Sequence, residues 1–228
     1  MTHLIHQLGI PTTLSFHDVY SLTDTSLLSF LPRPAYALLV VFPVSSTYEK
    51  FRIEEDNSRE VYAGSGPDEP VVWFKQTIGN ACGLIGLLHS VCNGKARSEI
   101  RPGSDLDKLL GEAVPLAPDA RAELLYQSQA LESAHADAAK KGDSTAPDAA
   151  TKVDLHFVAF VKDEESGDLW ELDGRRKGPI KRGNLGRDDD LLSEKGQAVG
   201  VQAFLKREEE AGGVDLRFSV VMLGPSFD

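Results

Sequence analysis

The sequence has 228 residues, of which 41% are hydrophobic and 26% are charged, so it can form a globular domain with a real core and is not expected to be disordered. Its net charge of −11 argues against nucleic-acid binding, because an acidic surface repels phosphate backbones. The two cysteines, Cys82 and Cys92, are too few for a disulfide-stabilised secreted domain and lack the spacing of a zinc site.

The N-terminus and the apolar segments place the protein in a soluble class. Residues 1–16 are polar and contain histidines, without the apolar stretch of a signal peptide. The longest apolar run, residues 35–44, is far too short to cross a bilayer. We therefore expect a protein of the cytoplasm or the nucleus, with no membrane partner and no nucleic-acid partner.

The first part of the chain contains one short helix and one clear strand. A helix with a Thr or Ser cap is predicted at residues 25–31, where two prolines follow it. Residues 36–42 (YALLVVF) form an unbroken apolar run, which is typical of a strand buried on both faces. Residues 45–70 are polar and are interpreted as a loop.

A buried helix is predicted directly after Cys82. Residues 84–94 are of helical length and end in Asn-Gly, a common C-terminal stop. Their apolar positions cover most of a helical wheel, and a helix that is apolar nearly all round lies inside the protein. Cys82 is therefore placed at the N-terminal tip of a central helix.

The second part of the chain is predicted to contain both helices and strands. Helices are expected at 104–111, at 118–133 and within 188–210, and strands at 153–161, 168–172 and 214–223. Residues 134–152 hold almost no large apolar side chain and are expected to form a long loop, which in a compact domain is usually functional or disordered. No domain boundary is placed there, so residues 1–228 are interpreted as one domain.

Cys82 is the candidate nucleophile. The N-terminal end of a helix and a neighbouring imidazolium both favour the thiolate, the form of cysteine that attacks carbonyl groups. The small residues Gly79, Ala81 and Gly83 would let a substrate carbonyl approach the sulfur. By itself, Cys82 is interpreted equally well as a buried structural cysteine. Cys92 is interpreted as a core residue.

His156 is the candidate base, because a titratable residue is unusual in the middle of an apolar strand. The alternative is a core histidine with satisfied hydrogen bonds. If Lys162 faces Asp168 across the following turn, His156 lies opposite residue 174 and beside Asp173. Asp173 would then hold the imidazole in the required tautomer and orientation, a role compatible with that of an ordinary turn aspartate.

Gln76 is the candidate oxyanion donor, acting with the backbone N–H of Cys82 six residues later. An exposed loop glutamine is the alternative. His89 lies two helical turns from Cys82 and is too far away to act as its base. The other histidines are interpreted as structural or surface residues, namely His3, His6, His17 and His135. No metal and no cofactor is expected.

The segments that carry these residues resemble the ubiquitin C-terminal hydrolase (UCH) family of cysteine peptidases. Residues 75–93 (KQTIGNACGLIGLLHSVCN) are similar to its active-site segment, VDLHFVAFV to its histidine strand and LWELDGRRKGPI to its aspartate segment. The resemblance runs nearly end to end and is closest to the short single-domain members. Members usually begin with an additional segment containing a Trp, and its absence here predicts reduced stability or affinity.

This resemblance implies a fold and an activity. The fold is α+β and papain-like, with a central antiparallel sheet flanked by helices, a knotted chain and a crossover loop over the active site at about residues 134–152. The implied enzyme is a deubiquitinating thiol hydrolase that removes small or unstructured adducts from the C-terminal glycine of ubiquitin through a Cys82 thioester. The resemblance assigns His156 as general base and acid, Asp173 as orienter and Gln76 as oxyanion donor.

The implied partner is ubiquitin, with NEDD8 as a second candidate, and we expect a monomer. Two alternatives remain open. A ubiquitin-binding module with weak or no catalysis would bind ubiquitin without turnover. A general papain-like peptidase would cut unrelated peptides. The acidic balance of the chain favours a basic partner surface.

Overall fold

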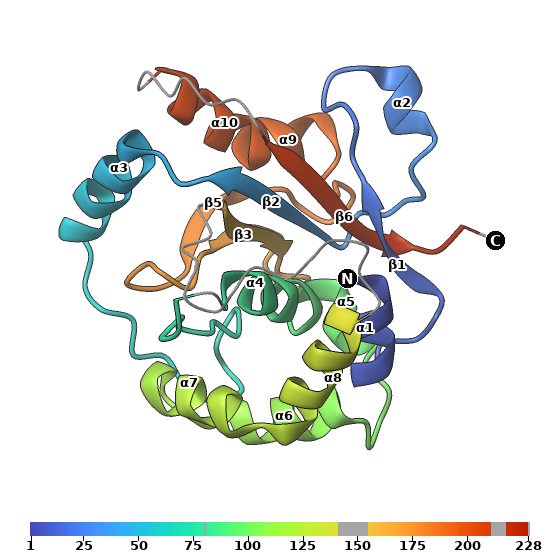
Figure 1. The fold of residues 1–228 in the computed structure, drawn as a ribbon. Coiled ribbons are helices and arrows are strands. Elements are labelled where there is room, and N and C mark those ends of the chain that lie inside the picture. Colours follow the sequence, from blue (N-terminus) through green and yellow to red (C-terminus); the bar gives the residue numbers. More distant parts are fainter. Residues whose placement is uncertain (80, 141–154, 211–217, 228) are drawn as a thin grey trace.

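The structure, a computed structural model, describes residues 1–79, 81–140, 155–210 and 218–227. Within these ranges the chain forms a six-stranded antiparallel sheet with strand order β1-β6-β2-β3-β4-β5. The strands are β1 (Leu14–Asp18), β2 (Ala37–Pro43), β3 (Leu155–Lys162), β4 (Asp168–Leu172), β5 (Ile180–Asn184) and β6 (Ser219–Pro225). Helices lie on both sides of this sheet, which confirms the predicted α+β class (Figure 1).

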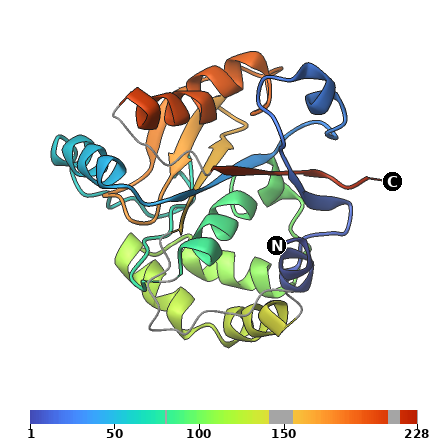
Figure 2. The ribbon, with the colours of Figure 1, turned by 45° about the horizontal axis from the view of Figure 1, so that its top comes forward.

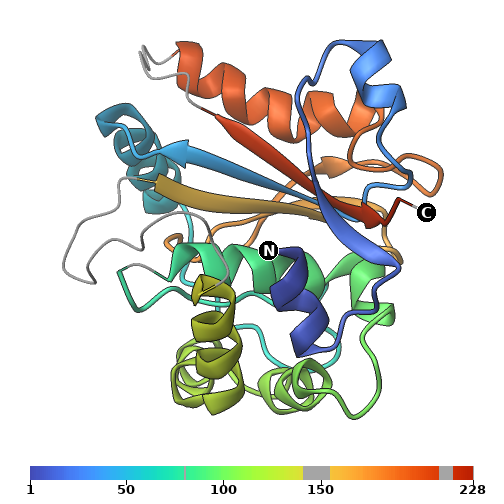
Figure 3. The ribbon, with the colours of Figure 1, turned by 45° about the vertical axis from the view of Figure 1, so that its right-hand side comes forward.

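The helices form one layer on each face of the sheet, as Figure 3 shows most clearly. One layer contains α1 (Thr2–Leu8), α4 (Cys82–Val91), α5 (Gly94–Ser98), α6 (Asp105–Ala113), α7 (Pro118–Gln127) and α8 (Gln129–Lys140). The other contains α2 (Thr25–Ser29), α9 (Glu194–Val199) and α10 (Val201–Glu210). None of the helices in the described ranges is long and apolar enough to span a membrane.

The two central strands pack against both layers. Leu39 of β2 and Ala159 of β3 belong to the hydrophobic core on the α4 side, whereas Leu38 and Phe160 belong to the core on the α10 side. Side chains that alternate between two apolar cores produce an unbroken apolar run, because neither face meets water. The strand predicted at residues 36–42 is therefore confirmed as one buried on both faces.

Helix α4 lies against the centre of the sheet, in contact with β2 and β3. Gly86 permits this close approach, because a Cβ at this position would lie 2.8 Å from Leu39 Cδ1 and 3.1 Å from Phe157 Cβ. The helix begins at Cys82, whose side chain is buried. The predicted position of Cys82 at the N-terminal tip of a buried central helix is thus confirmed.

The prediction that residues 45–70 form a loop is wrong for the first half of that segment, where α3 (Ser46–Asn57) lies. Ser45 caps this helix, since its Oγ accepts a hydrogen bond from the Tyr48 N–H at 2.9 Å. Only Tyr48 and Asp56 of α3 are buried, so the helix lacks an apolar stripe and its pattern resembles that of a polar loop. It stands at one end of the sheet (Figures 1 and 2), where the Arg207 guanidinium of α10 lies over the ring of Phe51.

The predicted crossover loop also needs correction. The helix expected at 118–133 is interrupted at Ser128 and gives two helices, α7 and α8, and the second continues to Lys140. Residues 134–140 are therefore helical, because Leu131 and Ala134 pack in the core and α8 lies against α1. Alanine has the highest helix propensity, so this alanine-rich segment can be helical although it contributes almost no large apolar side chain to the core. Residues 141–152, and with them the predicted knot, lie outside the described residues.

Smaller differences concern the ends of elements. The cap of α2 is Asp24, whose carboxylate accepts from the backbone N–H groups of Ser26 and Leu27, and not a Thr or Ser. The region expected to hold one helix within 188–210 holds two, α9 and α10, separated at Gly200. The described part of the last strand begins at Ser219, and residues 214–217 of that prediction lie outside the described ranges, as do residues 153 and 154 of the β3 prediction.

The β3–β4 hairpin is shifted by one residue from the predicted pairing. Lys162 pairs with Leu169 and not with Asp168. The turn is closed by two hydrogen bonds, from Asp163 N to Asp168 O and from Gly167 N to Asp163 O. Gly167 adopts φ +73°, a left-handed conformation that glycine tolerates best. The geometry of this turn, which hydrophobic patterning does not reveal, sets the register.

Candidate active site

His156 and Asp173 meet at the open end of the β3–β4 hairpin. His156 Nε2 lies 2.8 Å from Asp173 Oδ1, and the two residues are 2% and 0% exposed. The observed register explains this contact, because successive residues of a strand point to opposite faces. With Ala159 paired to Leu172, the next residue, Asp173, lies on the same face as His156. The register predicted from the sequence would have directed the carboxylate to the other face.

Cys82 reaches the same histidine from the start of α4. Its Sγ lies 3.6 Å from the backbone oxygen of Leu155, the residue before His156, and the thiol is close enough to His156 to help raise the pKa of its imidazole. Because Nε2 is bound to Asp173, Nδ1 is the ring nitrogen that remains for the sulfur. The structure therefore brings together three predicted residues from α4, β3 and the end of β4.

The charges of this group are set by burial and by mutual contact. Burial lowers the pKa of His156, but the negative charge of Asp173 and hydrogen bonds with Asp173 and Cys82 outweigh it and raise the pKa to about 9. Burial would raise the pKa of Asp173, yet the positive charge of His156 and the surrounding hydrogen bonds hold it well below its usual range. At neutral pH the site thus contains an imidazolium, the partner that favours a neighbouring thiolate.

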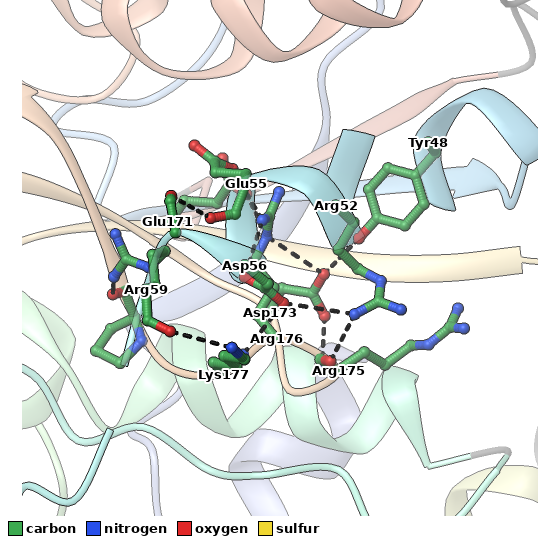
Figure 4. Close-up of polar contacts among 12 residues, drawn as sticks. Tyr48, Arg52, Glu55, Asp56, Arg59, Glu171, Asp173, Arg175, Arg176 and Lys177 are labelled. Atoms are coloured by element: carbon green, nitrogen blue, oxygen red, sulfur yellow. Dashed lines mark hydrogen bonds and ion pairs between the residues drawn. The ribbon is translucent and has the colours of Figure 1, made fainter. Parts of the chain in front are cut away.

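The Asp173 carboxylate is fixed by more than the histidine. Its Oδ1 also accepts from the backbone N–H of Arg175 at 2.9 Å, and its Oδ2 accepts a hydrogen bond from the Tyr48 hydroxyl (Figure 4). The indole Nε1 of Trp73 donates to the backbone oxygen of Asp173 at 3.1 Å. Sequence reasoning missed Tyr48 because its segment was interpreted as a loop. The available signal was Ser45, a good N-cap residue, followed by a long stretch without Gly or Pro.

Gln76 lies beside the segment that leads to Cys82, half-buried, with its donors engaged. Its side-chain Nε2 is 2.9 Å from the backbone oxygens of both Ile78 and Gly79. Its backbone N–H donates to Gly174 O at 2.8 Å, which ties this segment to the residue after Asp173. In this conformation the Gln76 amide binds the backbone of the segment that leads to Cys82. To donate to an oxyanion, Nε2 has to give up one of these two hydrogen bonds.

The remaining cysteine and the helical histidine are structural, as predicted. His89 is fully buried, its Nε2 accepts from the Phe74 N–H at 2.9 Å, and burial lowers its pKa to about 3. Burial also raises the pKa of Cys92 to about 12, so this thiol stays protonated in the core. In the described part of the chain, no group of three or more His, Cys, Asp or Glu side chains is placed to hold a metal ion.

Comparison with known proteins adds relatives over the whole chain. The family model "Ubiquitin carboxyl-terminal hydrolase, family 1" matches residues 1–205. Ubiquitin carboxyl-terminal hydrolase isozyme L1 of Homo sapiens is 36% identical over 98% of this chain and 93% of its own length. Ubiquitin carboxyl-terminal hydrolase YUH1 of Saccharomyces cerevisiae is 32% identical over 100% of this chain and 92% of its own.

A solved structure shares the fold. The catalytic domain of Trichinella spiralis UCH37 bound to ubiquitin vinyl methyl ester superposes with a TM-score of 0.71, covering 99% of this chain and 91% of that domain. The two sequences are 20% identical.

Proposed function

This chain belongs to the ubiquitin carboxyl-terminal hydrolase family, whose members hydrolyse C-terminal bonds of ubiquitin with a cysteine, and we propose which residues do so here. Cys82, His156 and Asp173 perform the reaction together with Gln76. The observation that carries this assignment is that one buried imidazole lies between a carboxylate at 2.8 Å and a thiol at a helix N-terminus. The family match favours hydrolysis over binding of ubiquitin without turnover.

The proposed reaction is acyl transfer. The Cys82 thiolate attacks the carbonyl carbon of the terminal glycine, and a C–S bond forms while the carbonyl electron pair moves to oxygen. The backbone N–H of Cys82 and the Gln76 amide stabilise this oxyanion. His156 then gives its proton to the leaving amine as the C–N bond breaks, which leaves a thioester.

Hydrolysis of the thioester restores the enzyme. Neutral His156 takes a proton from water, and the resulting hydroxide equivalent attacks the thioester carbonyl. Collapse of the second intermediate breaks the C–S bond and returns the Cys82 thiolate beside an imidazolium. Asp173 stays ionised throughout, because its pKa lies well below its usual range, and it keeps Nε2 protonated so that Nδ1 carries the exchanged proton.

We propose ubiquitin as the principal substrate protein, NEDD8 as a second one, and small or unstructured peptides as leaving groups, with a monomer acting in the cytoplasm or nucleus. A groove of about 590 Å³ next to the Cys82 segment, between it and α7–α8, supports an extended tail on this side; Ala81, Leu84, Leu125 and Leu131 are among its lining residues. The net charge of −11 complements a basic partner surface.

The test is the release of a fluorogenic amine from the C-terminus of ubiquitin. We expect turnover by the wild type and by Cys92→Ala, which alters only a core thiol, and none by Cys82→Ala. Equal rates for the wild type and Cys82→Ala would contradict the assignment. Parallel reactions with NEDD8 and with leaving groups of increasing size decide the finer proposals.

A further inference from the structure

Helix α3 sends one aromatic side chain into the candidate active site. Tyr48 is 1% exposed, and its hydroxyl donates a hydrogen bond to Asp173 Oδ2 (Figure 4). Its ring lies edge-on to Phe42 at 4.8 Å and at 5.9 Å from the His156 ring, measured between centroids. We propose that Tyr48 is a positioning residue for the hydrolysis: it holds the Asp173 carboxylate so that Oδ1 faces His156. The inference rests on the proposed roles of Asp173 and His156.

The two oxygens of the Asp173 carboxylate have different partners, so removal of the Tyr48 hydroxyl would leave one of them without a hydrogen-bond donor. Oδ1 accepts from His156 and from the Arg175 N–H, whereas Oδ2 accepts from Tyr48. Arg176 does not replace this contact, because its Nε is 4.0 Å from Oδ2, beyond hydrogen-bond distance. A fully buried carboxylate oxygen without a donor is unfavourable. Without the hydroxyl, the carboxylate would turn toward another donor and away from the imidazole.

The rest of α3 fixes the hydroxyl relative to the segment after Asp173. Arg52 Nη1 donates to Arg175 O at 3.1 Å, and Asp56 Oδ2 accepts from the Lys177 N–H at 3.3 Å (Figure 4). Both contacts join one turn of α3 to the backbone two to four residues beyond the aspartate. These contacts tie the helix to the segment, so Tyr48 and Asp173 are already positioned relative to each other before substrate arrives.

A set of ion pairs further fixes the position of α3, and with it the contact between Tyr48 and Asp173. Arg176, 3% exposed, binds Glu55 of α3 at 2.8 Å, and Arg182 of β5 binds Glu55 at 2.6 Å and Glu171 of β4 at 2.7 Å. These ion pairs link α3 to β4, which precedes Asp173, and to β5, which follows it. They restrain the helix, whereas Tyr48 hydrogen-bonds directly to the Asp173 carboxylate.

The variant Tyr48→Phe keeps the ring and removes only the hydroxyl. We expect kcat for the fluorogenic ubiquitin amide to fall about 10- to 100-fold, the equivalent of one lost hydrogen bond to a charged group. KM should stay unchanged, because Tyr48 is buried behind Asp173 and offers no surface to ubiquitin. A merely structural role would instead lower the melting temperature and leave kcat of the folded fraction intact.

Tyr62→Phe is the matched control. The Tyr62 hydroxyl also donates to a carboxylate, Glu69 Oε2 at 2.7 Å, but this pair contacts none of Cys82, His156 and Asp173. The Tyr62→Phe variant should lose a comparable hydrogen bond and keep the wild-type kcat. A double-mutant cycle adds a second test: in an Asp173→Asn background, Tyr48→Phe should no longer reduce kcat.

A readout that needs no turnover is the proton on His156 Nε2, which should give a slowly exchanging low-field NMR signal in the wild type and a weakened or lost one in Tyr48→Phe. A wild type without turnover would refute the proposed function, while this signal would still test the inference. The inference is overturned if Tyr48→Phe keeps both the signal and the wild-type kcat, if Tyr62→Phe loses as much kcat, or if the loss persists undiminished beside Asp173→Asn.

Discussion

Replacing Asp173 by asparagine removes the charge that keeps His156 protonated while preserving the size of the side chain. The pKa of His156 is raised from 6.5 to about 9, although burial acts in the opposite direction. That difference corresponds to about 3 kcal/mol in favour of the imidazolium. In Asp173→Asn the burial remains and the opposing charge is gone, so the pKa of His156 should fall below 6.5.

The activity should follow the imidazolium. We expect kcat/KM of the wild type to decline as the pH rises through about 9, where His156 loses the proton needed by the leaving group. In Asp173→Asn the alkaline decline should begin below pH 6.5, so that activity at pH 7.5 is strongly reduced. The assay is hydrolysis of the fluorogenic ubiquitin amide from pH 5 to pH 10. An alkaline limb at the same pH in both proteins would refute the reasoning.

Stability supplies an independent check with a defined sign. A base whose pKa is raised on folding contributes its full stabilisation below pH 6.5, and this contribution is lost as the pH rises through about 9. The wild type should therefore be more stable than Asp173→Asn at pH 6. The difference in their free energies of unfolding should shrink by about 3 kcal/mol when the pH is raised above 9. Urea unfolding at both pH values measures this difference, and a gap that widens with pH would contradict it.

Three further substitutions test other parts of the account. Gln76→Ala should reduce kcat by about 100- to 1000-fold with little change in melting temperature, and a kcat equal to that of the wild type would exclude an oxyanion role. Arg121→Met should lower the free energy of unfolding by about 3–5 kcal/mol. Arg121 is fully buried, and its partner Glu69 would lose a salt bridge of 2.6 Å. An unchanged urea midpoint would be incompatible with this expectation. Gly174→Ala would bring a Cβ within 2.8 Å of Ile85 Cγ2, so we expect about 1–3 kcal/mol of destabilisation and reduced kcat; wild-type values of both would argue against a tight contact.

The elements with a strong apolar pattern were predictable from the sequence. The run of residues 36–42 and the helix after Cys82 are buried because nearly every side chain is apolar, and such segments have few alternatives. The neighbourhood of His156 and Asp173 was also predictable, because a short hairpin confines both to one end of the sheet. The exact register was not, since it depends on a turn closed by Gly167.

Polar structure was the part that escaped prediction. Helix α3 is held by Tyr48, Asp56 and ion pairs with the segment after Asp173, and none of these contacts produces a periodic apolar signal. Its charged residues pair partly with one another, but the arginines that anchor the helix to the rest of the fold, Arg175, Arg176 and Arg182, lie more than 100 positions away in the chain. Such pairings follow from the fold and leave no local signature, so the second contact of the Asp173 carboxylate became visible only in three dimensions.

The most direct test is the reaction of the protein with ubiquitin that carries an electrophilic vinyl methyl ester at its C-terminus. We predict one covalent adduct, located on Cys82 by peptide mass mapping, formed at a rate that follows protonation of His156 and abolished by Cys82→Ala. An adduct on Cys92, or equal labelling of the wild type and Cys82→Ala, would contradict the claim that the sulfur beside His156 is the nucleophile.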